Sequence, residues 1–171
     1  WRTAADTFAD LNRLARRRPD WQFSIRPHPR YDQPELYAHL QRFVPPERRW
    51  RTDPHLRLAD AVRAADAVVI VNNRSSAIVE ASLLPTPVLL LCPDMTSHDL
   101  ADWGLANWPT LASVEALERE LTALFTDPVR REQRTAQSRS AVHQFLGENP
   151  QSATPRAAEA IETLITTRTP A

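Results

Sequence analysis

The uninterrupted apolar run from Ala67 to Val71 constrains the fold more than any other feature of the sequence. A strand with one face in water alternates apolar and polar residues, but this run offers no polar position to either face. Both faces must therefore be covered, as they are when helices flank a parallel sheet on each side. A second run, from Val88 to Leu91, repeats the pattern. We therefore expect an α/β fold with three layers and a parallel sheet.

The spacing of apolar residues divides the rest of the chain into strands and helices. Trp21, Phe23 and Ile25 alternate with polar residues, which predicts a strand. Parallel strands are expected at about 21–26, 49–52, 67–72 and 87–92, with a further candidate near 109–111. Helices are expected over 1–18, 34–43, 56–65, 77–84, 113–126, 128–146 and 153–168, with a loop and short helix at 94–99.

The length of 171 residues fits one domain, residues 1–171, of which 113–171 form a helical C-terminal extension. The helical pattern begins at Trp1, so the strand that should precede it is expected to be missing, which would leave a gap in the sheet. We therefore expect a fragment of a larger two-domain protein.

Charge and cysteine content exclude several classes of protein. Lys plus Arg and Asp plus Glu both number 21, so no excess of positive charge indicates nucleic-acid binding. The single cysteine, Cys92, excludes an internal disulfide framework and leaves too few thiols for a zinc site. No apolar run approaches the roughly 20 residues of a membrane span. We expect a cytoplasmic protein without an integral membrane segment; the inner face of the membrane is an alternative site within the cytoplasm.

Polar residues follow two of the expected strands, where parallel α/β proteins bind ligands. Ser75 and Ser76 stand at the start of a helix, whose free N–H groups and positive dipole end favour an anion such as phosphate. Glu80 lies one turn further on the same face, where a carboxylate could accept bonds from ribose hydroxyls. The alternative is that a serine only caps the helix and that Glu80 is solvated.

The other loop, Arg26-Pro27-His28-Pro29, has two prolines that restrict the backbone around its histidine. An imidazole at the carboxyl end of a strand can hold the phosphate that becomes the leaving group. The alternative for His28 is an ordinary surface histidine. Its combination with the Ser-Ser pair favours a site.

These two motifs resemble those of the C-terminal domains of bacterial surface-polysaccharide transferases with the GT-B fold, among them sialyltransferases, capsule Kdo transferases and CDP-glycerol transferases. The resemblance covers residues of about 20–92. It implies a Rossmann-like nucleotide-binding domain, the C-terminal half of a GT-B enzyme. It also implies that His28 is the catalytic residue that holds the donor phosphate, and that the substrate-binding residues are Arg26, His28, Asn73, Arg74, Ser75, Ser76 and Glu80.

The resemblance implies a CMP-, CDP- or UDP-linked sugar as donor, and a separate N-terminal domain that binds the acceptor. No cofactor and no metal are expected. The chain departs from many GT-B enzymes because it lacks a glycine in the helix-entry loop, where Arg74 precedes the serines. Arg74 is equally consistent with a phosphate contact and with a solvent-exposed side chain.

Other polar and aromatic residues have simpler explanations. Asp94, His98 and Asp99 could suggest a metal, but such loop residues are more often helix caps and surface groups. Trp103 and Trp108 could stack on a base or cover a cleft, and core packing is at least as good an explanation.

Two further functions compete with group transfer. A sugar-nucleotide epimerase of the same fold is one alternative, although such enzymes usually carry a Gly-Gly-rich loop where this chain has Asn73-Arg74-Ser75. A non-catalytic α/β regulatory or interaction domain is the other. Calorimetry with nucleotides would separate these classes.

Overall fold

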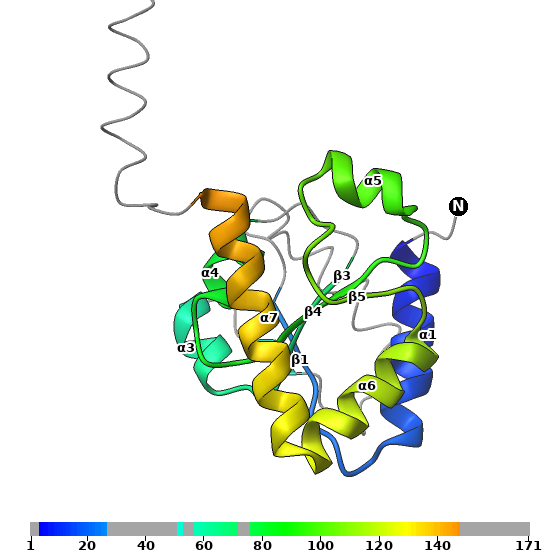
Figure 1. Ribbon diagram of the computed structural model, residues 1–171. Coiled ribbons are helices and arrows are strands. Elements are labelled where there is room, and N and C mark those ends of the chain that lie inside the picture. Colours follow the sequence, from blue (N-terminus) through cyan, green and yellow to red (C-terminus); the bar gives the residue numbers. More distant parts are fainter. Residues whose placement is uncertain (1–3, 27–50, 53–56, 72–75, 148–171) are drawn as a thin grey trace, which may run out of the picture.

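The computed structural model describes residues 4–26, 51–52, 57–71 and 76–147 of the chain (Figure 1). Within them, strands and helices follow one another in the order that the sequence predicts. The strands are β1 Ser24–Ile25, β2 Arg51–Thr52, β3 Val68–Val71, β4 Val88–Leu91 and β5 Thr110–Leu111. The helices are α1 Ala4–Arg17, α3 Leu58–Arg63, α4 Ala77–Ser82, α5 Ser97–Asp102, α6 Val114–Thr126 and α7 Pro128–Leu146. The helices expected at 34–43 and 153–168 lie outside the described residues.

All described strand pairs are parallel, as predicted. The main sheet has the order β3-β4-β5, with Val68 opposite Val88 and Leu90 opposite Thr110. The candidate strand near 109–111 is therefore confirmed as β5, which lies last in the order of the described strands. The other two strands form a separate pair, in which Ser24 lies opposite Arg51. The described strands thus form two small parallel sheets.

Helices cover both faces of the main sheet, which confirms the three-layer α/β arrangement (Figure 1). β4 is the central strand, and all four of its residues are buried. Val88 and Leu90 pack into a cluster with residues of α3, α4 and α7. Leu89 and Leu91 point the other way, into a cluster with α1 and α6. An apolar residue at every position of β4 is what this double coverage requires.

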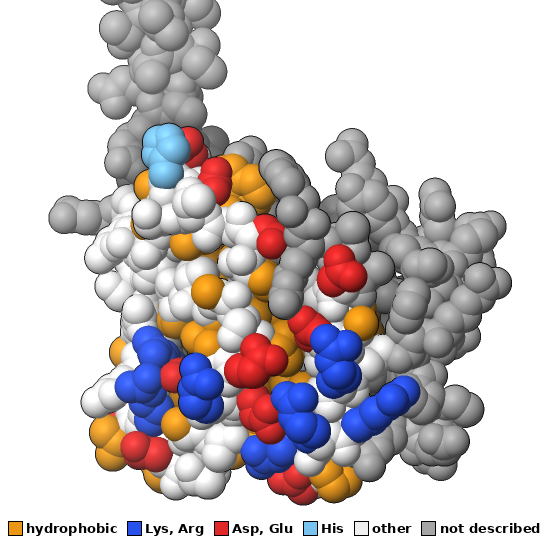
Figure 2. Space-filling model, turned by 90° about the vertical axis from the view of Figure 1, so that its right-hand side faces the viewer, with side chains coloured by type: hydrophobic (Ala, Val, Ile, Leu, Met, Phe, Trp, Pro, Cys, Tyr) orange, Lys and Arg blue, Asp and Glu red, His pale blue; other side chains and the backbone are white. Residues whose placement is uncertain are grey.

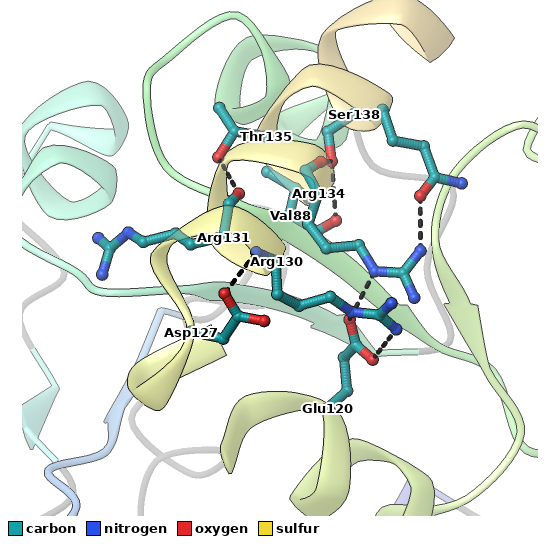
Figure 3. Close-up of polar contacts among 9 residues, drawn as sticks. Val88, Glu120, Asp127, Arg130, Arg131, Arg134, Thr135 and Ser138 are labelled. Atoms are coloured by element: carbon teal, nitrogen blue, oxygen red, sulfur yellow. Dashed lines mark hydrogen bonds and ion pairs between the residues drawn. The ribbon is translucent and has the colours of Figure 1, made fainter. Parts of the chain in front are cut away.

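Helices α6 and α7 belong to these layers. Ser113 caps α6 by accepting a hydrogen bond from the N–H of Ala116, and Asp127 caps α7 by accepting from the N–H groups of Val129 and Arg130. Ser138 of α7 lies against the sheet, with its Oγ 3.0 Å from the Val88 carbonyl oxygen (Figure 3). The turn between α6 and α7 therefore sends one helix to each face of the sheet.

The strand predicted at 21–26 is shorter than expected. Only Ser24 and Ile25 form β1, while the aromatic residues before them pack against helices. The Trp21 and Phe125 rings meet edge to face with centroids 5.1 Å apart, and the Arg18 guanidinium lies 3.9 Å from the Trp21 ring centroid. Side-chain packing thus engages Trp21 and Phe23, which alternation alone would assign to the strand.

Candidate functional site

The carboxyl end of the main sheet is the place where a ligand site is expected. β3 and β4 end in register, with Val71 opposite Leu91, so the chain leaves both strands at the same edge. After β4 the chain runs through Cys92 and Pro93 toward α5, and after β3 it runs toward Ser76 and α4. In open parallel sheets this edge is the usual binding position.

Three of the seven predicted site residues fall in the described part of the chain: Arg26, Ser76 and Glu80. Arg26 is exposed and directly follows β1, and Ser76 and Glu80 are exposed residues at the beginning of α4. The other four, His28, Asn73, Arg74 and Ser75, lie outside the described residues. The convergence of the His28 loop with the serine pair therefore stays a prediction.

Ser76 is the N-cap residue of α4, but its side chain does not cap the helix. Its carbonyl oxygen accepts hydrogen bonds from the N–H groups of Val79, at 3.0 Å, and Glu80, at 3.2 Å. Its hydroxyl makes no capping hydrogen bond and is exposed. The structure therefore shows no capping bond from the Ser76 side chain, and Ser75, the other candidate cap, lies outside the described residues.

Glu80 stands in the first turn of α4, and it is exposed. Two other residues of this helix, Ile78 and Ala81, are buried in the cluster beneath it. α4 is thus amphipathic: one face packs into the apolar cluster, and the other presents Glu80 to solvent. Both explanations of Glu80, a solvated acid and a ribose contact, are compatible with this position.

The acidic segment after β4 forms a helix cap, as the simpler interpretation predicted. Thr96 and Asp99 make a capping box at the start of α5: the Thr96 hydroxyl accepts from the Asp99 N–H at 3.1 Å, and Asp99 accepts from the Thr96 N–H at 2.8 Å. The hydrogen bonds from Thr96 hold the pKa of Asp99 below its ordinary value. The carboxylate of Asp99 is thus occupied by its own helix.

The same segment shows no metal-binding geometry. His98 Nε2 lies 3.6 Å from Asp102 Oδ2, and both side chains are largely exposed. Across the described ranges, no three His, Cys, Asp or Glu side chains are grouped so that they could hold a metal ion.

The two tryptophans of this region belong to the core. Trp108 is 2% exposed and its Nε1–H donates to Ser82 Oγ at 2.9 Å. Trp103 is half-buried and packs against the same apolar cluster. Core packing is therefore the explanation that holds for Trp108, and stacking on a nucleotide base is wrong for it.

The most elaborate polar cluster was not predicted from the sequence. Glu120 of α6 is 8% exposed and accepts hydrogen bonds from two arginines of α7 (Figure 3). Arg130 Nη2 lies 2.8 Å from Oε2, and Arg134 Nε lies 2.5 Å from Oε1. The four-residue spacing of the arginines, which puts both on one face of a helix, is the signal that could have revealed it. The cluster joins α6 to α7.

A shallow groove lies apart from the carboxyl edge. It is lined by Pro85, which leads toward the amino end of β4, by Pro128, which begins α7, and by Arg131, Glu132 and Thr135. On the face drawn in Figure 2, basic and acidic side chains alternate over the lower half, with no uniform positive area among the coloured residues.

No described helix is both long and apolar enough to cross a membrane.

Comparison with known proteins adds no relative: no family model matches the chain, and no match was found among the curated proteins or the solved structures.

Proposed function

We propose that this chain is the donor-binding half of a GT-B-type glycosyltransferase, or of a related transferase, that uses a nucleotide-activated sugar for bacterial surface polysaccharide synthesis. The proposal rests on the two sequence motifs, the His-Pro loop at 26–29 and the Ser-Ser pair with its glutamate at 75–80. The single structural observation that supports it most is the exposed Ser76 hydroxyl, which α4 does not use, at the end of the sheet where β3 and β4 terminate together.

In this proposal each residue has a distinct part in holding the donor. His28 donates a hydrogen bond to the phosphate that leaves with the nucleotide, and so stabilises the negative charge that grows as the glycosidic bond breaks. The hydroxyls of Ser75 and Ser76 donate to the same phosphate. Glu80, one helical turn further, accepts hydrogen bonds from the ribose hydroxyls. Arg26 contributes positive charge beside the phosphate.

In this proposal a separate domain binds the acceptor and supplies the general base. Two acids among the described residues, Asp99 and Glu120, are already engaged, one in a helix cap and the other by two arginines. Neither is suited to remove a proton from an acceptor, because hydrogen bonds to the charged form lower the basicity of a carboxylate.

Isothermal titration calorimetry with CMP, CDP, UDP and GDP tests the proposal. We expect one nucleotide to bind the 171-residue chain, and His28→Ala to weaken that binding by about 1.5–3 kcal/mol, as for a hydrogen bond to a charged group. Ser76→Ala should weaken it by about 1 kcal/mol. Thermal unfolding of each variant should match that of the parent chain, because the Ser76 hydroxyl makes no capping bond.

Glu80→Gln provides the most specific comparison, because Glu132→Gln is a matched change on an exposed face of α7. Glu80→Gln should weaken nucleotide binding and leave binding of inorganic pyrophosphate unchanged, since the proposed contact is to ribose. Glu132→Gln should change neither. If none of the four nucleotides binds, or if His28→Ala binds as tightly as the parent, the donor-binding function is refuted and a non-catalytic α/β domain replaces it.

A further inference from the structure

Strand β3 has one edge along which no other described strand pairs, called its free edge below. Among the described strands it pairs only with β4, on one side. The Val68 N–H donates to the Pro87 carbonyl oxygen of that neighbouring chain segment at 2.9 Å. In a parallel ladder successive residues direct their N–H groups to opposite sides, so the N–H groups of Val69 and Val71 point away from β4. These donors face the open edge.

The side chains of β3 are those of an interior strand. All four residues of β3 are valine or isoleucine, yet each is only half-buried, whereas the equally apolar β4 is completely buried. Natural edge strands usually carry charges, prolines or bulges that prevent further pairing. β3 has none of these from Val68 to Val71. Its composition therefore suits a strand with neighbours on both sides.

The other sheet indicates which kind of strand would fit beside β3. Trp21 and Phe23, which lead into β1, pack against the same apolar cluster as Val69 and Val71. Helix α1 supplies Leu11 and Leu14 to that cluster and continues directly into the segment that forms β1. A helix that covers a parallel sheet and then enters a strand is normally the crossover of a βαβ unit. Its first strand would lie parallel to β1 and next to it.

The pairings give this strand one place. The described pairs are β1-β2 and β3-β4-β5, all parallel. A doubly wound sheet has the order 3-2-1-4-5-6, in which the strand before the first helix lies at the centre. If that central strand is removed, a parallel pair and a parallel triplet remain. The described strands form such a pair and such a triplet.

We propose that the free edge of β3 is a docking surface for one apolar β-strand, which runs parallel to β3, lies between β3 and β1, and leads into α1. Such a strand would accept hydrogen bonds from the N–H groups of Val69 and Val71 and would cover the exposed parts of their side chains. It would also join the two sheets into one. This inference concerns the completeness of the sheet and does not depend on which ligand the domain binds.

A grafted strand provides the test. The sequence Ala-Val-Val-Ile-Val, copied from residues 67–71, is joined ahead of the full 171-residue chain through a short Gly-Ser linker. The matched control is Ala-Asp-Val-Asp-Val on the same linker, because two carboxylates cannot be buried between helix layers without a large cost. Amide hydrogen exchange by NMR and thermal unfolding are measured for the parent and both extended proteins.

In the parent chain, Val69 and Val71 should exchange at least about tenfold faster than Val68 and Ile70, whose neighbour β4 is in place. The apolar extension should slow exchange at Val69 and Val71 by about tenfold or more and raise the melting temperature by several degrees. The control extension should do neither. Cooperative unfolding of the protein with the apolar extension, together with non-cooperative unfolding of the parent, would also support the proposal.

Three results would overturn it. Equal, slow exchange at all four β3 residues in the parent would mean that the edge is already covered. Fast exchange at Val69 and Val71 despite the apolar extension would mean that the edge does not accept a strand. Protection of these two residues that rises with the concentration of the parent protein would assign the edge to a second copy of the chain.

Discussion

Trp108 Nε1–H donates a hydrogen bond of 2.9 Å to Ser82 Oγ inside the core, where Ser82 is 0% and Trp108 2% exposed. The bond links the end of α4 to the segment that enters β5, so it fixes the helix that carries Ser76 and Glu80 relative to the sheet. Phe145, near the end of α7, meets the Trp108 ring edge to face at a centroid distance of 5.8 Å. One buried side chain thus joins three parts of the fold.

Ser82→Ala should lower the free energy of unfolding by about 1–3 kcal/mol, because it leaves the indole N–H of Trp108 buried without an acceptor. Chemical denaturation of the variant measures this. Ser140→Ala, an exposed serine of α7, is the control and should cost much less. The double variant Ser82→Ala/Trp108→Phe should lose less unfolding free energy than the two single variants lose together, since no donor is then left unsatisfied. Strict additivity would show that the hydrogen bond contributes nothing.

Glu120→Gln should destabilise the fold in a pH-dependent way. Burial alone would raise the pKa of Glu120, but hydrogen bonds from Arg130 and Arg134 outweigh it and hold the pKa below its ordinary value. A carboxyl with a lowered folded-state pKa stabilises the protein above its unfolded pKa of about 4.3, and this stabilisation is lost as the pH falls through the folded pKa. At pH 7 the variant should be less stable by about 1–2 kcal/mol, toward the lower end because the Arg130 side chain is 39% exposed.

The measurement for Glu120 is urea denaturation at a series of pH values from 7 to about 3. The difference between parent and Glu120→Gln should be constant near neutrality and shrink below about pH 4. Glu132→Gln, a matched change at an exposed position of α7, is the control and should change the free energy of unfolding at pH 7 much less. A difference that persists unchanged to low pH would mean that the charge of Glu120 is not what stabilises the contact.

The pattern of apolar residues predicted the layers, because β4 has no polar residue that could face solvent. Its even and odd residues enter two different clusters, one on each face, and an uninterrupted run such as Val88–Leu91 permits no other arrangement. The starts of α6 and α7 were also predictable, since Ser113 and Asp127 cap them locally. Local signals and burial patterns are properties of short segments, so a single sequence contains them.

Contacts between distant segments were not predictable in the same way. Trp21 satisfies the alternation of a strand, but the ring of Phe125, about a hundred residues further along the chain, draws it into an aromatic cluster. The site was predicted only as a set of residue types. Ser76 and Glu80 are exposed, which fits both a ligand contact and a solvated side chain, and the carboxylate of Asp99 is engaged in a capping box with Thr96. Spacing cannot show whether a hydroxyl is already used by its own helix, because that depends on backbone geometry.

Gly104→Ala should cost about 1–2 kcal/mol of unfolding free energy, and most of that cost should remain when Phe145 is shortened. Gly104 has φ of +69°, a conformation that side chains disfavour, and an added Cβ would lie 2.9 Å from Phe145 Cε2. The contact is with the far end of a partly exposed side chain, which can move, whereas the backbone strain cannot be relieved in this way. In a Phe145→Ala background, Gly104→Ala should therefore still destabilise by about 1 kcal/mol in denaturation experiments. If the substitution becomes neutral there, the collision with the ring, rather than the positive φ, explains why glycine stands at this turn.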